Sequence, residues 1–94
     1  MVESMTQKEI LYTIKAARDS VWVIEDTIEK INNGSTASLR FKRNIQRNIE
    51  HLKIVVAKQE IVDSGEDISD LQEAIVIGET KLAENIWPSE NEIL

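Results

Sequence analysis

The side chains that could carry chemistry are few. The sequence contains no Cys and a single His, His51, which excludes thiol nucleophiles, Cys-based zinc sites and any site that needs two imidazoles. One helical turn before His51 stands Arg47, a cation where a metal site needs a ligand. The acidic residues Glu25, Asp26 and Glu29 form a group typical of a solvated helix face. We therefore predict no catalytic residue, no cofactor and no metal ion, and a protein that is not an enzyme.

Basic residues are concentrated in one segment of an acidic chain whose formal net charge is -6. Four of the eleven basic residues fall within eight positions. They are Arg40, Lys42, Arg43 and Arg47. We expect this basic cluster to be solvated or to pair with acids of the same chain or of a second subunit. The alternatives are that it contacts nucleic-acid phosphates, or an acidic protein partner or membrane headgroups.

The last third of the chain has the opposite charge. Residues 59–94 contain ten acidic residues and one basic residue, Lys81. Most acidic surfaces only keep a protein soluble, but a rigid acidic helix can also imitate the phosphate rows of a nucleic acid. An acidic inhibitor of a nucleic-acid-binding enzyme is therefore a further hypothesis.

The elements that position these residues are predicted to be helices. With 4% aromatic residues, three Gly and one Pro, the sequence lacks the turn residues that a β-sandwich or barrel requires. The first helix is expected over residues 7–32, because Thr6 and Glu9 form a capping box and Asn33-Gly34 is a stop signal. Its apolar residues alternate at spacings of four and three, as in a heptad repeat. They are Ile10, Ile14, Ala17, Val21, Ile24, Ile28 and Ile31.

Two further helices are expected over residues 37–64 and 68–87, with a flexible tail over 88–94. In the second helix a row of apolar residues along one face, its seam, ends where the polar residues Gln59 and Asp63 take the next positions. The face by which this helix contacts its neighbours must therefore rotate or change partner along its length. That seam consists of Ile45, Ile49, Leu52 and Val56. In the third helix residues 74–78 are apolar on all sides, which indicates either enclosure or contact with a partner.

Four large apolar residues are the candidate partner-binding residues: a Trp beside the seam of the first helix, two residues of the apolar run 74–78, and the Trp at the end of the third helix. They are Trp22, Val76, Ile77 and Trp87. An exposed aromatic residue is typical of a binding hot spot, whereas the alternative for both Trp residues is that they cover the core.

These patterns predict a single all-α domain, 1–94, in which an antiparallel helical hairpin and a third helix form a three-helix bundle. We expect bundles to associate through coiled-coil-like seams, giving a homodimer, because a shorter third helix would leave part of the seam uncovered. No apolar run approaches the roughly 18 residues of a membrane span, and the acidic N-terminus is unlike a signal peptide. We therefore expect a soluble, cytoplasmic protein.

The predicted function is a protein–protein interaction module, acting as a small adaptor, regulator or inhibitor through a helical face. The first alternative is a nucleic-acid-associated accessory protein that uses the basic cluster. The second is the acidic inhibitor described above.

Overall fold

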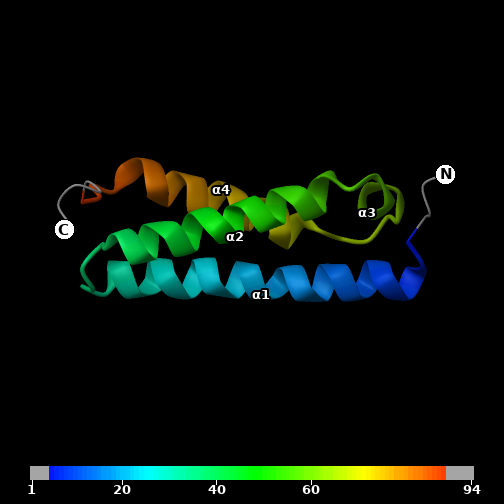
Figure 1. Cartoon of the computed structure of the whole chain (residues 1–94), viewed down its shortest axis with the longest axis horizontal. Helices are drawn as coiled ribbons and strands as arrows, with labels where there is room; N and C mark the ends of the chain where they lie inside the picture. Colours follow the sequence, from blue (N-terminus) through cyan, green and yellow to red (C-terminus); the bar gives the residue numbers. More distant parts are fainter. Residues whose placement is uncertain (1–4, 89–94) are drawn as a thin grey trace.

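The computed structural model describes residues 5–88, and every regular element in this range is an α-helix. The order along the chain is α1 (Gln7–Asn32), α2 (Leu39–Ala57), α3 (Gln59–Asp63) and α4 (Ser69–Glu84), as Figure 1 shows. In this part of the chain no helix combines the length and the apolarity needed to cross a membrane. The predicted tail lies outside the described residues apart from Pro88.

Helix α1 has the bounds expected from its capping signals. The Thr6 hydroxyl accepts a 3.1 Å hydrogen bond from the Glu9 amide, and the Glu9 carboxylate accepts one of 3.1 Å from the Thr6 amide. At the other end Gly34 adopts a φ of 103°, and the Ser35 amide donates to the carbonyl of Lys30. Both helix ends therefore have part of their exposed backbone groups satisfied.

Helix α2 begins two residues later than predicted and ends seven residues earlier. It begins at Leu39 because the Ser38 hydroxyl accepts a hydrogen bond from the Phe41 amide and so caps the helix. It ends because Lys58 is extended, with a ψ of 126°, after which the chain turns into α3. The prediction of one helix over 37–64 was wrong in this respect.

The break at Lys58 has a physical reason in the core. A straight helix would continue the seam of α2 with Gln59 and Asp63, which are polar and exposed here. The turn into α3 instead buries Ile61, which is 1% exposed. The change of contact that the sequence indicated is thus achieved by interrupting the helix.

Helix α4 is shorter than the range predicted for the third helix. It ends at Glu84, because Asn85 is extended, and so Trp87 lies beyond the helix. The Trp87 indole N–H donates a 3.0 Å hydrogen bond to the carbonyl of Leu82, one of the carbonyls left without a partner at the helix end. The C-terminal limit of 87 was therefore too long.

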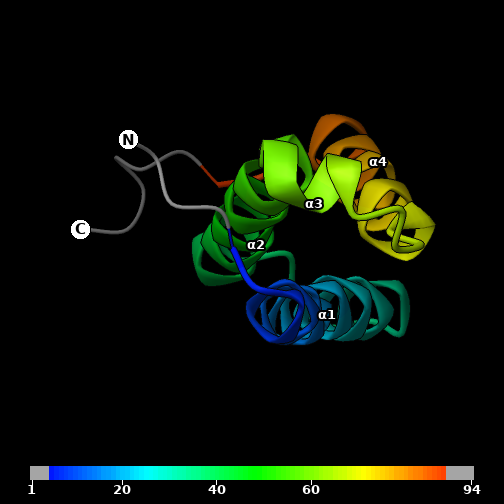
Figure 2. The same cartoon turned by 90° about the vertical axis from the view of Figure 1, so that its right-hand side faces the viewer.

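The three longer helices each pack against the other two. Helix α2 runs antiparallel to α1, while α4 returns parallel to α1, and Figure 2 shows the three grouped around a common axis. The apolar seam of α1 faces this interior, with Ala17 and Ile24 fully buried. Since the seam packs within the chain, it gives no support to a coiled coil between copies.

Candidate interaction groove between α1 and α4

Two adjoining hollows lie between the C-terminal half of α1 and the facing side of α4. Their volumes are about 210 and 400 Å³, and both are lined by Ile28, Asn32 and Ile77. We refer to the two together as the α1–α4 groove. The first hollow is also lined by Val76, Thr80, Lys81 and Glu84. The second is also lined by Glu25, Glu29 and Asn33.

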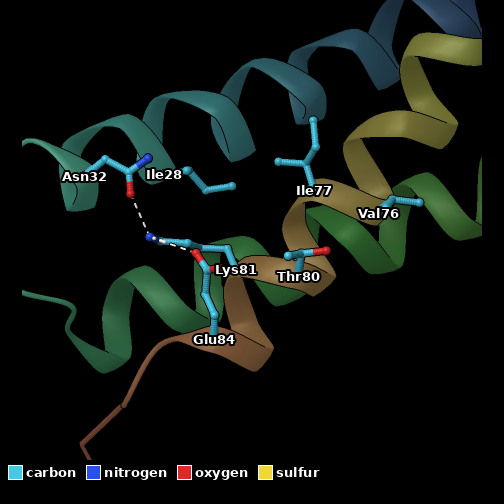
Figure 3. A pocket seen from close by; sticks show the side chains of 7 residues that line it. All are labelled: Ile28, Asn32, Val76, Ile77, Thr80, Lys81 and Glu84. Carbon is cyan, nitrogen blue, oxygen red and sulfur yellow. Dashed lines mark hydrogen bonds and ion pairs between the residues drawn. The ribbon is translucent and has the colours of Figure 1, made fainter.

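The floor of the groove is apolar. Ile28 is half-buried and packs against the core, whereas Ile77 is 38% exposed and Val76 is 63% exposed. Figure 3 shows Ile28 and Ile77 entering the same space from the two helices. Apolar surface of this kind, left open between two helices, favours contact with another apolar group.

One end of the groove is closed by a buried lysine. The side chain of Lys81 is only 11% exposed, and its ammonium donates a 2.7 Å hydrogen bond to Asn32 Oδ1 (Figure 3). It also forms a 3.4 Å ion pair with Glu84. The positive charge of Lys81 is thus compensated by groups of the groove itself.

The rim of the groove on α1 is acidic. Glu25 and Glu29 are one helical turn apart and exposed, and neither forms an ion pair within residues 5–88. Trp22 lies one turn before Glu25 on the same face of α1 and is 65% exposed. The groove therefore has an apolar floor, an exposed aromatic residue at its N-terminal side and unpaired negative charge along one edge.

An ion pair fixes α4 to α1 before the groove begins. Arg18 Nε donates a 2.9 Å hydrogen bond to Asp70 Oδ2, and an Arg18 guanidinium nitrogen lies 3.4 Å from the Asp67 carbonyl. The hydrogen bond to Asp70, together with the negative charge of that carboxylate, raises the pKa of Arg18 above its usual value. Because both side chains are about half exposed, the pair mainly fixes the register of the two helices.

The structure brings three of the four predicted partner-binding residues to this side of the molecule. Val76 and Ile77 line the groove, and Trp22 is exposed on the helix that forms its acidic rim. Trp87, in contrast, is half-buried and packs against the core. The alternative weighed for the Trp residues, that they cover the core, therefore describes Trp87 and not Trp22.

The basic cluster is divided by the structure. Arg40, Arg43 and Arg47 line an open hollow of about 560 Å³ at the N-terminal half of α2, together with Asn44. Lys42 is half-buried and does not line this hollow. Three of the four predicted residues therefore share one face.

His51 forms a contact that the sequence did not reveal. Its Nδ1 atom lies 2.8 Å from the Oγ atom of Ser20, which is buried at the α1–α2 interface. Over the described range no carboxylate hydrogen-bonds to the His51 ring, and no group of three His, Cys, Asp or Glu residues is arranged to hold a metal ion. The pair joins two helices and lacks the third group of a catalytic triad.

Several groove residues were missed by sequence reasoning. Ile28 was assigned to the seam, and Asn32 was given no role. Lys81 did carry a signal, because it follows Leu71, Ala74 and Gly78 at the spacing of the buried face of α4. A lysine at such a position needs a polar partner in the neighbouring helix.

Comparisons with protein-family models, with curated proteins and with solved structures found no match. The class of protein is described by its fold and surface: over residues 5–88 it is an all-helical chain with an open groove that has an apolar floor and an acidic rim.

Proposed function

We propose that the chain is a protein–protein interaction module, which binds a protein partner through the α1–α4 groove and acts as an adaptor, regulator or inhibitor. The observation that carries this proposal is the exposure of Val76 and Ile77 beside the half-buried Ile28. Trp22 is exposed on α1 one turn before Glu25, and large exposed aromatic residues are typical anchors of protein interfaces. The function is binding, and the proposal assigns no catalysis.

The architecture that presents the groove is, in this proposal, a three-helix bundle made by α1, α2 and α4. The homodimer expected from the sequence stays a prediction, as does a cytoplasmic location. Because the seam of α1 is used inside the chain, a homodimer would have to pair exposed residues instead. Besides Trp22, Val76 and Ile77, the exposed apolar residues of the described part of the chain include Leu11, Tyr12, Ile54, Val62 and Ile86.

The proposal is tested by retention of a partner on the tagged chain in lysate from the source cell, with nuclease present and elution along a salt gradient. We expect one protein to be retained at high salt and to be lost with Trp22→Ala or Ile77→Asp. The matched control is Ile54→Asp, which places the same charge at an exposed apolar position of α2. Retention that is equal for Ile77→Asp and the wild type, with circular dichroism showing both folded, would contradict the proposal.

The second candidate is nucleic-acid association, which is favoured by the arginines around the hollow on α2. Phosphate binding weakens steeply with salt, because each neutralised phosphate releases counterions. We expect nuclease-sensitive material to elute at moderate salt, and Arg40→Glu or Arg47→Glu to abolish its retention. Salt-resistant binding that survives both substitutions would contradict this candidate.

The acidic-inhibitor hypothesis has less support from the arrangement of charges on α4. Asp70, Glu79 and Glu84 form ion pairs with basic residues of the same chain rather than an open row. This third candidate predicts that binding survives Arg47→Glu and weakens when acids of α4 are neutralised.

A further inference from the structure

We infer that the partner segment bound by the α1–α4 groove is an amphipathic helix whose apolar stripe is flanked by Lys or Arg residues. This inference rests on the proposed function, because it names the chemistry of the partner for that same groove.

The apolar floor of the groove can contact an apolar stripe of limited length on the partner. From Glu25 to Asn33 the groove follows eight residues of α1, which corresponds to roughly 12 Å, or about two helical turns. A helix lying along this length would present side chains at positions i, i+3 or i+4, and i+7 to Ile28 and Ile77. An extended strand would need an exposed backbone edge to pair with, and the helices of this groove offer none.

The acidic rim determines which residues should flank the apolar stripe of the partner helix. Glu25 and Glu29 stand along one edge without a cation within the described part of the chain, and Glu84 stands on the opposite edge. The cation that lines the groove, Lys81, is buried and already bonded to Asn32 and Glu84. A partner that covered Glu25 and Glu29 with apolar or acidic groups would leave negative charges desolvated, whereas Lys or Arg flanks compensate them.

The same charge argues against a second copy as the occupant. Two copies that joined through this groove about a two-fold axis would bring Glu25 and Glu29 of one copy against either the same rim or the α4 edge of the other. That α4 edge carries Glu84, and its lysine, Lys81, is already bonded to Asn32 and Glu84. Like charges that face one another across an interface oppose association. A basic amphipathic helix from another protein can contact the apolar floor and also compensate the negative charge of the rim.

The test uses the full ¹⁵N-labelled chain and two synthetic peptides of 18 residues. The peptides share a leucine stripe at helical spacing, and one carries Lys and the other Glu at the flanking positions. We expect the Lys peptide to shift the backbone amide signals of Ile28, Asn32 and Ile77 and the Glu peptide to leave them unchanged. The interaction should weaken as salt is raised without being abolished, because the apolar contact is not screened.

Two charge-reversal variants test whether the acidic rim, rather than the net charge of the chain, attracts the Lys peptide. Glu29→Lys places a like charge beside the Lys peptide, and we expect its affinity to fall roughly fivefold. Glu50→Lys makes the same change of charge at an exposed position of α2 and should leave the affinity within a factor of about two, since it lies away from the groove. The inference is overturned if the two peptides bind alike, if the shifted signals lie on α2, or if Glu50→Lys weakens binding as much as Glu29→Lys.

Failure of the inference and failure of the proposed function give different results. If a partner is retained from lysate through Ile77 and Glu29→Lys does not weaken its binding, the groove binds protein but does not select a basic helix. If Ile77→Asp changes neither retention from lysate nor binding of the Lys peptide, the groove is not a binding site and both are overturned.

Discussion

Gly78 on α4 faces Ile49 on α2 so closely that a Cβ atom at position 78 would lie 2.8 Å from Ile49 Cδ1 and 3.0 Å from Ile49 Cγ1. The same atom would lie 3.5 Å from Ile24 Cγ2 on α1. Three helices therefore meet at the one residue of α4 that has no side chain. The absence of a Cβ atom allows α4 to lie close enough to α1 and α2 for Ala74 to be buried with it.

Gly78→Val should destabilise the fold, although Val is the better helix former. The added side chain must displace Ile49 or move α4 outward, which we expect to lower the free energy of unfolding by about 2 kcal/mol. Ala83→Val, at an exposed position of the same helix, should cost about 0.5 kcal/mol. Urea unfolding followed by circular dichroism measures both, and equal stability of the two variants would contradict the close approach.

Because the ammonium of Lys81 is buried, we expect replacement of its partner Asn32 to lower the free energy of unfolding more than replacement of Lys81 itself. Asn32→Ala leaves the charge of Lys81 with Glu84 alone, and should cost about 1.5 kcal/mol of unfolding free energy. Lys81→Met removes the charge and keeps a similar volume, so we expect a change below about 1 kcal/mol. Unfolding of both variants in urea is the measurement. A larger loss for Lys81→Met than for Asn32→Ala would show that the charge itself stabilises the fold.

The capping box should make the stability of the fold sensitive to acid. The amide and hydroxyl of Thr6 lower the pKa of Glu9 below its ordinary value. A group with a lowered pKa contributes stability above its unfolded pKa and loses it as the pH falls through the folded pKa. The contribution of Glu9 is therefore present at neutral pH and lost at acidic pH, below its ordinary value of 4.5.

Glu9→Gln is the matched control, because Gln can accept the same hydrogen bond from Thr6 but does not titrate. Between pH 7 and pH 3 the wild type should lose more unfolding free energy than Glu9→Gln. Asp67, whose pKa is lowered by the hydroxyl and amide of Ser69, is present in both chains and cancels in the comparison. Parallel pH profiles of the two chains would be the contrary result.

The two Trp residues should differ in their accessibility to solvent. In Trp87→Phe the remaining Trp22 is 65% exposed, and we expect strong quenching of its fluorescence by acrylamide. In Trp22→Phe the remaining Trp87 packs on the core and should be quenched more weakly, with emission at a shorter wavelength. Equal quenching constants in the two variants would mean that Trp22 is covered in solution.

Much of the fold was predictable because its signals are local. The capping box at Thr6 and the stop at Gly34 define α1, and its heptad spacing identifies the face that is buried. That the helix is interrupted at Lys58 could not be predicted, because neither Gly nor Pro occurs there. The polar residues Gln59 and Asp63 are equally compatible with a continuous helix whose contact face rotates and with an interrupted helix. Burial of Ile61, a tertiary effect, decided between them.

Of the candidate site, only the exposed apolar residues were predictable. Trp22 was selected because it lies beside the apolar seam of α1, and Ile77 because it lies in a run that is apolar on all sides. The groove itself depends on which residues of α1 face α4, and no local pattern gives the parallel register that places Asn32 beside Lys81. Likewise the contact between Ser20 and His51 joins residues 31 positions apart and follows from the packing of the hairpin.

The break at Lys58 divides the chain into the α1–α2 hairpin and a following segment that carries α3 and α4. Local or sub-global opening of such a segment is a general feature of proteins, so α4 can undock while the hairpin stays formed. The groove exists only while α4 is docked on α1, since α4 supplies Ile77 and Lys81. Any ligand of the groove therefore stabilises the docked form, and its apparent affinity is set in part by the fraction of molecules in which α4 is docked. A substitution far from the groove, such as one at the contact of α3 with α2, changes binding through that fraction alone.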